Sequence, residues 1–227
     1  MMIPMLFNTE MTDAIQNDRK IQTRRVIKGP ASDWPLEDLG EDAVMVYTDK
    51  KGIEHEKDAP GLWATFEDTD GAIEFPMFKA PCKPGDVIWV RETWATTEDG
   101  HDYLYRADAN PAAGGFIRDK NGKLHVPRWR PSIHMPYEAA RLFLKVKDVR
   151  VEHLQDITER GAFDEGLYKG WRDKIGDFAP SARVAFSWLW DTTIKPADRK
   201  RYSWDANPWV WAISFKKITR REAERLA

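Results

Sequence analysis

The sequence predicts an α+β protein built on a closed or nearly closed β-barrel, with flanking helices and an acidic insertion. Three segments that begin at Val87, Ala140 and Trp209 are rich in β-prone residues, which in the second segment alternate with polar ones. Such alternation is typical of strands that bury one face, and a barrel buries that face along every strand. We therefore expect these three strands to be neighbours, with helices beginning at Thr9 and Ser181 packed outside them.

The N-terminal part predicts one short helix and then a basic stretch. Residues Thr9–Asn17 carry apolar side chains at helical spacing, and Thr9 is a plausible N-cap. The stretch Arg19–Arg25 follows directly. A strand is expected to begin at its end, with Arg25–Ile27.

Two insertions interrupt the expected barrel, at about residues 30–83 and 95–129. In the first, Val44–Thr48 and Ile73–Phe78 predict the strands of a hairpin-like excursion. Between residues 31 and 75, thirteen acids oppose three lysines, a balance of −10, whereas the whole chain carries −2. A basic body with an acidic insertion is compatible with a polyanionic partner, and equally with an acidic excursion that only aids solubility.

The second half of the chain predicts the remaining strands and two helices. After a turn signal, Val87–Thr93 is strongly β-prone, whereas residues 95–128 are irregular. The expected later strands are Ala140–Val151 and Trp209–Ile218. Between them, a short helix is expected with Thr158 as its N-cap and Gly166 as its terminator, and a longer one over Ser181–Thr192.

Composition restricts the class of protein. A chain of 227 residues fits one elaborated domain over residues 1–227. No apolar run approaches the roughly 20 residues that span a bilayer, and Met1–Glu10 lacks the pattern of a signal peptide. Cys82 is the only cysteine, so no internal disulfide can form, which suits a reducing compartment. We therefore expect a cytoplasmic protein without a membrane partner, while its oligomeric state is unknown.

No pattern in the sequence points to a metal or a cofactor. The five histidines have no mutual ligand spacing, and Cys82 has no partner cysteine. The phosphate-binding patterns G-x-x-x-x-G-K-[ST] and G-x-G-x-x-G do not occur, and neither does G-x-S-x-G. We therefore expect neither a metal nor a cofactor.

Chemically, the most capable stretch is Arg19–Arg25, in which Lys20 and Thr23 lie among three arginines. The pKa of a lysine falls readily when it is desolvated or crowded by cations, and a neutral amine beside a hydroxyl is a base next to a potential nucleophile. The two side chains can converge if the segment turns, whereas on an extended strand they would point to opposite faces. A basic surface loop without chemistry is the alternative.

Several other residues are candidates for binding nucleic acid. Arg24, Arg25 and Arg91 can meet phosphate, and Trp94 or Trp129 can stack on a base.

Some of these candidates have structural alternatives. Glu92 is also a candidate binding residue, although a carboxylate paired with a nearby arginine is the alternative that we favour. Aromatic filling of a small barrel accounts better than stacking for Trp89, Trp188 and Trp211.

Four pieces of the chain together resemble an ASCH-domain protein, a member of the PUA-like β-barrel superfamily. The similarity is greatest to longer versions that phages and prophages often encode. In order, the pieces are Arg19–Arg25, Pro84–Glu92, Leu154–Gly166 and Trp209–Ile218. They cover well under half the chain, and both insertions lie outside the compact family core. The resemblance implies a PUA-like barrel.

The resemblance also implies an activity. Small family members that hydrolyse N4-acetylcytidine have a lysine regarded as proton acceptor, a threonine regarded as nucleophile and a glutamate regarded as proton donor. Matched residue by residue, these resemble Lys20, Thr23 and Glu165. The family usually has glycine two residues before the lysine and threonine directly after it, and here Asp18 and Ile21 take those places. The charge of Asp18 is expected to favour protonated Lys20 and so to weaken it as a base.

The sequence leaves two function classes open. The first is an amidohydrolase acting on N4-acetylcytidine or a related acylated nucleoside. The second is a noncatalytic module that binds RNA or a modified nucleotide. A ribonuclease is a lesser option, because other ASCH proteins resemble nucleases in their substrates. The expected partner is therefore a modified nucleoside or RNA.

Overall fold

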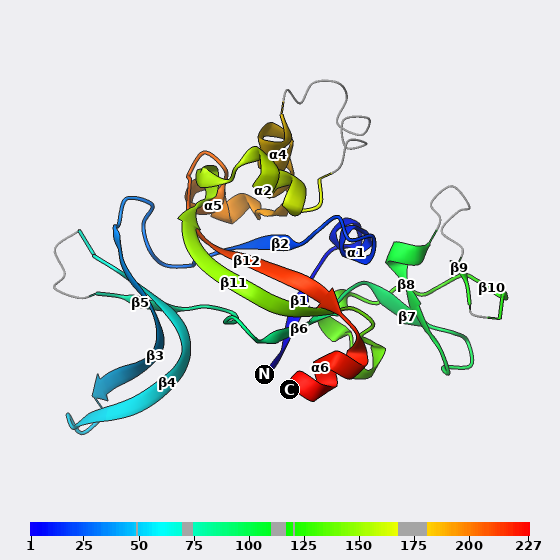
Figure 1. Ribbon diagram of the computed structural model, residues 1–227, viewed down its shortest axis with the longest axis horizontal. Helices are drawn as coiled ribbons and strands as arrows, with labels where there is room; N and C mark the ends of the chain where they lie inside the picture. Colours follow the sequence, from blue (N-terminus) through cyan, green and yellow to red (C-terminus); the bar gives the residue numbers. More distant parts are fainter. Residues whose placement is uncertain (49, 70–74, 110–116, 120, 168–180) are drawn as a thin grey trace.

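A curved five-stranded sheet forms the centre of the structure, with most helices at one end of it and two strand excursions beside it (Figure 1). The computed structural model describes residues 1–48, 50–69, 75–109, 117–119, 121–167 and 181–227. The mixture of sheet and helix agrees with the expected α+β class.

The central sheet combines strands from both ends of the chain and from its middle. Its strands are β1 (Met2–Leu6), β2 (Gln22–Val26), β6 (Val87–Arg91), β11 (Phe143–His153) and β12 (Trp209–Ile218). Their order is β1-β6-β11-β12-β2, with β1 parallel to β6 and all other neighbours antiparallel. The expectation that the strands predicted from Val87, Ala140 and Trp209 are neighbours is therefore confirmed, although β11 begins at Phe143.

The sheet is open between β1 and β2, so the expectation of a closed barrel is wrong. These strands are the two edges of the sheet. A side chain links them, because Arg25 Nη2 donates to the carbonyl oxygen of Leu6 at 2.9 Å. Leu6 and Phe7 on one side, and Thr23 and Arg25 on the other, line a pocket. Side chains around this pocket therefore occupy the place where a closed barrel needs strand-to-strand hydrogen bonds.

The first insertion shares the core of the central sheet. Its strands are β3 (Leu36–Thr48), β4 (Glu54–Phe66) and β5 (Met77–Lys79), paired in that order. Leu62, Ala64 and Phe66 of β4 are buried in one cluster with Ile88 and Leu144 of the central sheet. Only the far half of this insertion is therefore a surface excursion.

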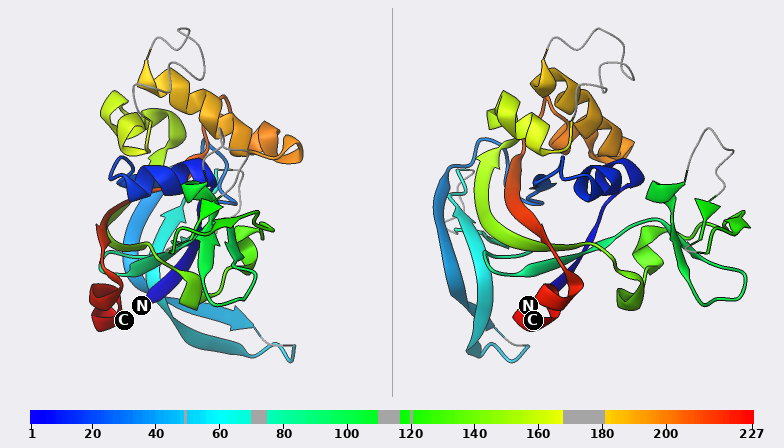
Figure 2. Two further views of the ribbon diagram at one scale, coloured as in Figure 1. Left: turned by 90° about the vertical axis from the view of Figure 1, so that its right-hand side faces the viewer. Right: turned by 45° about the vertical axis from the view of Figure 1, so that its right-hand side comes forward.

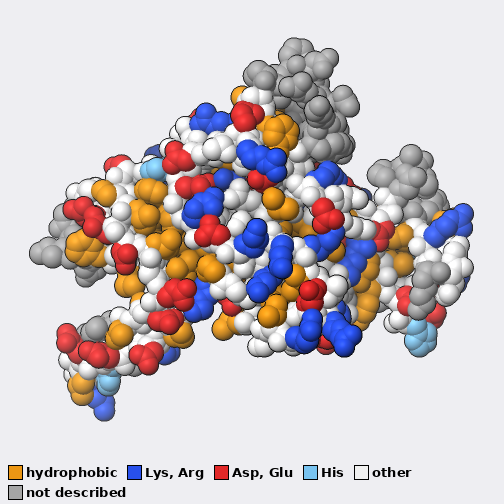
Figure 3. Space-filling model, viewed as in Figure 1, with side chains coloured by type: hydrophobic (Ala, Val, Ile, Leu, Met, Phe, Trp, Pro, Cys, Tyr) orange, Lys and Arg blue, Asp and Glu red, His pale blue; other side chains and the backbone are white. Residues whose placement is uncertain are grey.

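That far half of the β3–β4 hairpin is an arm that projects from the molecule and carries many acids (Figures 1 and 3). Glu54, Glu56 and Asp58 are exposed on it. The strand expected at Val44–Thr48 lies within β3, whereas β4 was not predicted because its acidic half conceals the apolar alternation of the other half. The strand expected at Ile73–Phe78 lies partly outside the described residues, and its end overlaps β5.

The second insertion, expected to be irregular, contains two short ladders. They are β7 (Trp94–Thr96) with β8 (Tyr103–Tyr105), and β9 (Ile117–Arg118) with β10 (Leu124–His125). Ala95, Leu104 and Ile117 form a small buried cluster beneath them. Strands of two or three residues are too short to show alternation, so the sequence did not reveal them.

Three helices gather near β2 at one end of the sheet (Figure 2). They are α1 (Thr9–Gln16), α2 (Glu159–Asp164) and α4 (Ala182–Thr193). The chain also contains α5 (Arg199–Tyr202), α6 (Arg220–Leu226) and 3-10 turns at Arg106–Asp108, Ser132–His134, Tyr137–Ala139, Leu154–Asp156 and Pro196–Asp198. No helix in the described part of the chain is long and apolar enough to cross a membrane.

Of the two N-caps predicted from the sequence, one is confirmed, and the longer helix begins one residue after the expected Ser181. Thr158 caps α2 as expected, and Ser181 caps α4. At α1 the N-cap is Asn8, whose Oδ1 accepts from the amide of Met11 at 2.8 Å, and Thr9 is the first helical residue. Asparagine caps at least as well as threonine, so the expected cap was one residue too late.

The buried face of α4 also differs from the expected one. Trp188 is 42% exposed, so the interpretation of this residue as aromatic core filling is wrong. Phe186 and Trp190, four residues apart, are buried instead and pack with Ala185 and Leu189.

Candidate functional site

The candidate site is the pocket between the edges β1 and β2, below α4, with a cavity of about 350 Å³. Most of its wall is apolar. The pocket brings together five of the nine predicted site residues, which are Lys20, Thr23, Arg24, Arg25 and Glu165.

The backbone joins the two distant parts of the site directly. Lys20 and Glu165 form an isolated antiparallel bridge, and the amide of Ile21 donates to the carbonyl oxygen of Asp164 at 2.9 Å. The stretch after Lys20 is therefore extended and continues into β2, so the turn that would bring Lys20 and Thr23 together does not form. Alternation along it directs Lys20 and Arg24 toward Glu165, and the pocket is wide enough for Thr23 to line it as well.

Two residues with left-handed backbone bring α1 and α2 close enough to make this bridge. Asp18 has φ 55°, and the next two amides both donate to the carbonyl oxygen of Ala14. Gly166 has φ 101° and ends α2 as expected. A Cβ atom on Gly166 would lie 2.8 Å from Cβ of Ala14 and 3.1 Å from Cβ of Lys20, so only glycine fits here.

Lys20 and Glu165 form a buried ion pair. Nζ of Lys20 lies 2.5 Å from Oε2 of Glu165 and 3.0 Å from its carbonyl oxygen, and the two residues are 3% and 4% exposed. Burial lowers the pKa of Lys20 from its ordinary value of 10.5, Glu165 opposes this shift, and Arg25 and Arg24 add to it. The amine is therefore easier to deprotonate than that of an ordinary lysine.

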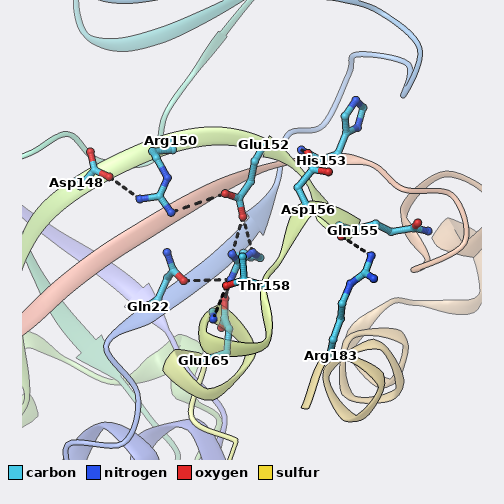
Figure 4. A network of polar contacts seen from close by, with 12 residues as sticks. Gln22, Asp148, Arg150, Glu152, His153, Gln155, Asp156, Thr158, Glu165 and Arg183 are labelled. Atoms are coloured by element: carbon cyan, nitrogen blue, oxygen red, sulfur yellow. Dashed lines mark hydrogen bonds and ion pairs between the residues drawn. The ribbon is translucent and has the colours of Figure 1, made fainter. Parts of the chain in front are cut away.

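Arg24 anchors the carboxylate of Glu165 from the other side. Its Nη1 donates to Oε1 of Glu165 at 3.1 Å, while Nε and Nη2 donate to Oε1 of Glu152 at 2.9 and 2.6 Å. Figure 4 shows Gln22 and Glu152 directed toward the same centre as Glu165. Because its guanidinium is held by two carboxylates and by Gln22, Arg24 is a positioning residue and is poorly placed to meet a phosphate.

Thr23 is buried in β2, opposite Ile213 of β12. Its hydroxyl has no hydrogen-bond partner among the described residues, so the hydroxyl and the Lys20 amine are not bonded to each other. The hydroxyl is thus not occupied by the described part of the protein, and the residue lines the pocket.

The acid at position 18 does not act on Lys20 as expected. Asp18 is exposed and pairs with Nζ of Lys217 at 2.8 Å. The charges that shift the pKa of Lys20 are Glu165, Arg25 and Arg24. Glu165, and not Asp18, is therefore the carboxylate that favours protonated Lys20.

The other predicted residues lie outside the pocket. Arg91 donates to the carbonyl oxygen of Ile133, and its guanidinium lies 5.5 Å from the ring centre of Trp89. Trp94 is 4% exposed beneath Arg130, so its ring faces are not open for a base.

Glu92 has the arrangement expected of a structural carboxylate. Arg141 donates to its two oxygens at 2.9 and 3.0 Å. Burial raises the pKa of Glu92, while Arg141 opposes that shift. The second predicted stacking residue, Trp129, lies under Arg106 and packs on the second insertion.

Sequence reasoning missed the wall of the pocket and one anchor. Phe7, Met11, Phe186 and Trp190 form much of the apolar wall. Helical spacing in α4 predicts a buried face but does not tell that this face lines a cavity. Glu152 gave no local signal, because its role depends on Arg24, more than a hundred residues away.

Comparisons of the chain with protein family models, with curated proteins and with solved structures find no match. Among the described residues, no group of three or more histidine, cysteine or acidic side chains is arranged to hold a metal ion. The resemblance to ASCH-domain proteins therefore stays a prediction.

Proposed function

We propose that the protein is an amidohydrolase with an ASCH-like, PUA-like fold that acts on N4-acetylcytidine or a related acylated nucleoside. The observation that carries this proposal is the buried amine–carboxylate pair of Lys20 and Glu165 in one pocket with the unoccupied hydroxyl of Thr23. The apolar wall suits a flat base, and the cavity lies within the range of small-molecule pockets, which begins at about 300 Å³.

One shared proton can prepare both members of the pair. Placed on Lys20, it gives an ammonium and a carboxylate; placed on Glu165, it gives a neutral amine and a carboxylic acid. Burial favours the neutral form, and the lowered pKa of Lys20 is in line with it. The neutral form supplies a base and an acid together, which is what the cleavage of an amide needs.

The proposed reaction has two stages. Oγ1 of Thr23 attacks the acyl carbonyl carbon, and its proton passes to Nζ of Lys20 through a water molecule in the pocket, because the two groups are not bonded to each other. The bond between the carbonyl carbon and nitrogen then breaks, and the departing cytosine amine takes the proton of Glu165. In the second stage, water attacks the acyl-threonine ester, Glu165 accepts a proton from that water, and the threonine oxygen recovers a proton from Lys20. Amide and water become carboxylic acid and amine, and the pair returns to its neutral form.

A noncatalytic module for RNA or a modified nucleotide is the second candidate. The observation that favours it is that Lys20 donates to Glu165 and not to Thr23. In a binding module this ion pair would only shape the pocket, and no acyl group would be transferred.

Turnover of N4-acetylcytidine by the purified protein tests the proposal. Thr23→Val and Lys20→Met should each lower kcat by roughly 100-fold or more, since each removes a reacting group, and the double variant should be scarcely worse than either one. Thr192→Val is the matched control, because it removes a threonine hydroxyl on α4 that donates to Leu189 and does not line the pocket. Wild-type protein that binds the nucleoside but releases no acetate would favour the binding module.

We further propose that the protein works in the cytoplasm. Cys82 is buried, and burial raises the pKa of its thiol to about 12, so this cysteine is an inert core residue that needs no disulfide partner.

A further inference from the structure

The charges around the pocket do not balance. Among the described residues, only two carboxylates, Glu165 and Glu152, bond to the three cations Lys20, Arg24 and Arg25. Both oxygens of Glu165 are bonded to Lys20 and Arg24. One positive charge in the wall of the pocket is therefore left without a bonded counter-charge.

Arg25 carries that charge. Within the described part of the chain it forms no ion pair, and its hydrogen bonds are made to main-chain carbonyl oxygens, at 2.9 Å to Leu6 and at 3.4 Å to Arg24. These contacts use at most two of the five N–H donors of the guanidinium. The side chain is half-buried, lies 5.0 Å from the ring centre of Phe7, and lines the pocket.

Partial burial makes the unpaired charge costly. Burial lowers the pKa of Arg25, while Glu165 and Cys82, neither of which bonds to it, oppose this shift. A ligand that brings an anion to Arg25 would remove this cost and supply charge-assisted hydrogen bonds. A planar guanidinium suits a phosphate especially well, since it can donate two parallel bonds.

The position of Arg25 agrees with a ligand that is longer than a base. Residues on an extended segment advance by roughly 3.3 Å each, so the backbone positions of Lys20 and Arg25 lie roughly 16 Å apart. The two side chains reach toward each other, since the charge of Arg25 acts on Lys20, and both line one pocket that a ligand with a base and an attached anion can occupy.

We propose that the pocket takes a pyrimidine nucleotide whose phosphate binds Arg25, rather than a neutral nucleoside. The choice of a pyrimidine depends on the proposed function, whereas the choice of a phosphate depends on the unpaired charge of Arg25. The phosphate can belong to a free nucleotide or to an RNA chain, and the two sources share the same chemistry at Arg25.

Affinities for ligands without an acyl group test this inference apart from any hydrolysis. Isothermal titration of the full chain with cytidine, CMP and the trinucleotide CpCpC should give at least tenfold tighter binding of CMP, of the trinucleotide, or of both, than of cytidine. CMP binding tighter than the trinucleotide indicates a free nucleotide, and the reverse indicates RNA. Added salt should reduce the advantage of the phosphate.

Variants locate the effect. Arg25→Gln should remove most of the phosphate advantage, measured as the ratio of the CMP affinity to the cytidine affinity of the same variant, while Arg25→Lys should keep part of it. The control is Arg183→Gln, because Arg183 also donates to a carbonyl oxygen and lies over a ring, that of Trp204, but does not line the pocket. Equal affinities of the wild type for cytidine, CMP and the trinucleotide would overturn the inference. So would an Arg25→Gln protein that is folded by circular dichroism and loses cytidine and CMP affinity equally.

Discussion

Glu165 influences the protonation of Lys20, and this coupling is the main chemical property of the site. Burial works against the ammonium of Lys20, whereas the carboxylate of Glu165 stabilises it by charge and by a hydrogen bond. Because the pKa of Lys20 is lowered in the folded state, the unfolded chain binds more protons near this pKa. The free energy of unfolding contributed by this group therefore rises with pH up to about 10.5.

We expect Glu165→Gln to lower the pKa of Lys20 further. The change removes the carboxylate that raises this pKa, while burial, Arg25 and Arg24 continue to lower it. Carbon NMR of the lysine Cε atom, followed through a pH titration, would measure the shift directly. Glu152→Gln is the control, since Glu152 bonds to Arg24 and not to Lys20. A Lys20 pKa that stays the same or rises in Glu165→Gln would contradict the coupling.

At the scale of elements, the site depends on how closely the end of α2 approaches α1. Residues far apart in the chain meet there because Gly166 has no Cβ atom and adopts a left-handed backbone. The main-chain bridge from Lys20 to Glu165 then holds the two side chains close to each other.

Gly166→Ala should destabilise the protein more than an ordinary glycine replacement in a turn. The left-handed backbone costs about 1 kcal/mol, and the contacts at 2.8 and 3.1 Å should add about 1–3 kcal/mol of overpacking. Gly85→Ala is the matched control, because Gly85 also has a positive φ, 91°, but a Cβ atom there meets nothing within 4 Å. Urea denaturation compares the two free energies of unfolding. Equal losses in both variants would mean that the end of α2 can shift without cost.

The helix and strand patterns show what local sequence can predict. Runs of β-prone residues and alternation identified β6, β11 and β12, and capping chemistry identified Thr158, because these signals lie within a few residues. The conformation around Lys20 did not follow from its neighbours, since its extended form is fixed by a bridge to a residue 145 positions later. The pairing of Glu152 with Arg24 was unpredictable for the same reason.

At the scale of the whole molecule, the open sheet and the first insertion define two regions. The opening between β1 and β2 holds the candidate site. In the insertion, the second half of β4 packs in the main core, whereas the acidic arm projects away from that core (Figure 2). The count of charges predicted an acidic excursion. It did not predict that the second half of β4 is buried, because burial depends on contacts between residues 62–66 and distant strands.

Shortening the arm should leave stability and the pocket nearly unchanged. Residues 44–58 can be replaced by Asn-Gly, a sequence that favours a two-residue hairpin turn, because Ala43 and Ala59 are cross-strand partners. Val44 and the residues from Glu54 to Asp58 are exposed, so their removal should change the free energy of unfolding by about 1 kcal/mol or less. Phe66→Ala, which empties a fully buried site at the base of the same strand, should cost about 3–5 kcal/mol.

Urea denaturation of the two variants, with cytidine and CMP titrations of the shortened protein, measures both effects. A shortened protein that unfolds as easily as Phe66→Ala would show that the arm supports the core. If it instead keeps its stability but binds CMP more tightly, the acids of the arm repel phosphate from Arg25 over a distance, and the arm belongs to the recognition of the ligand.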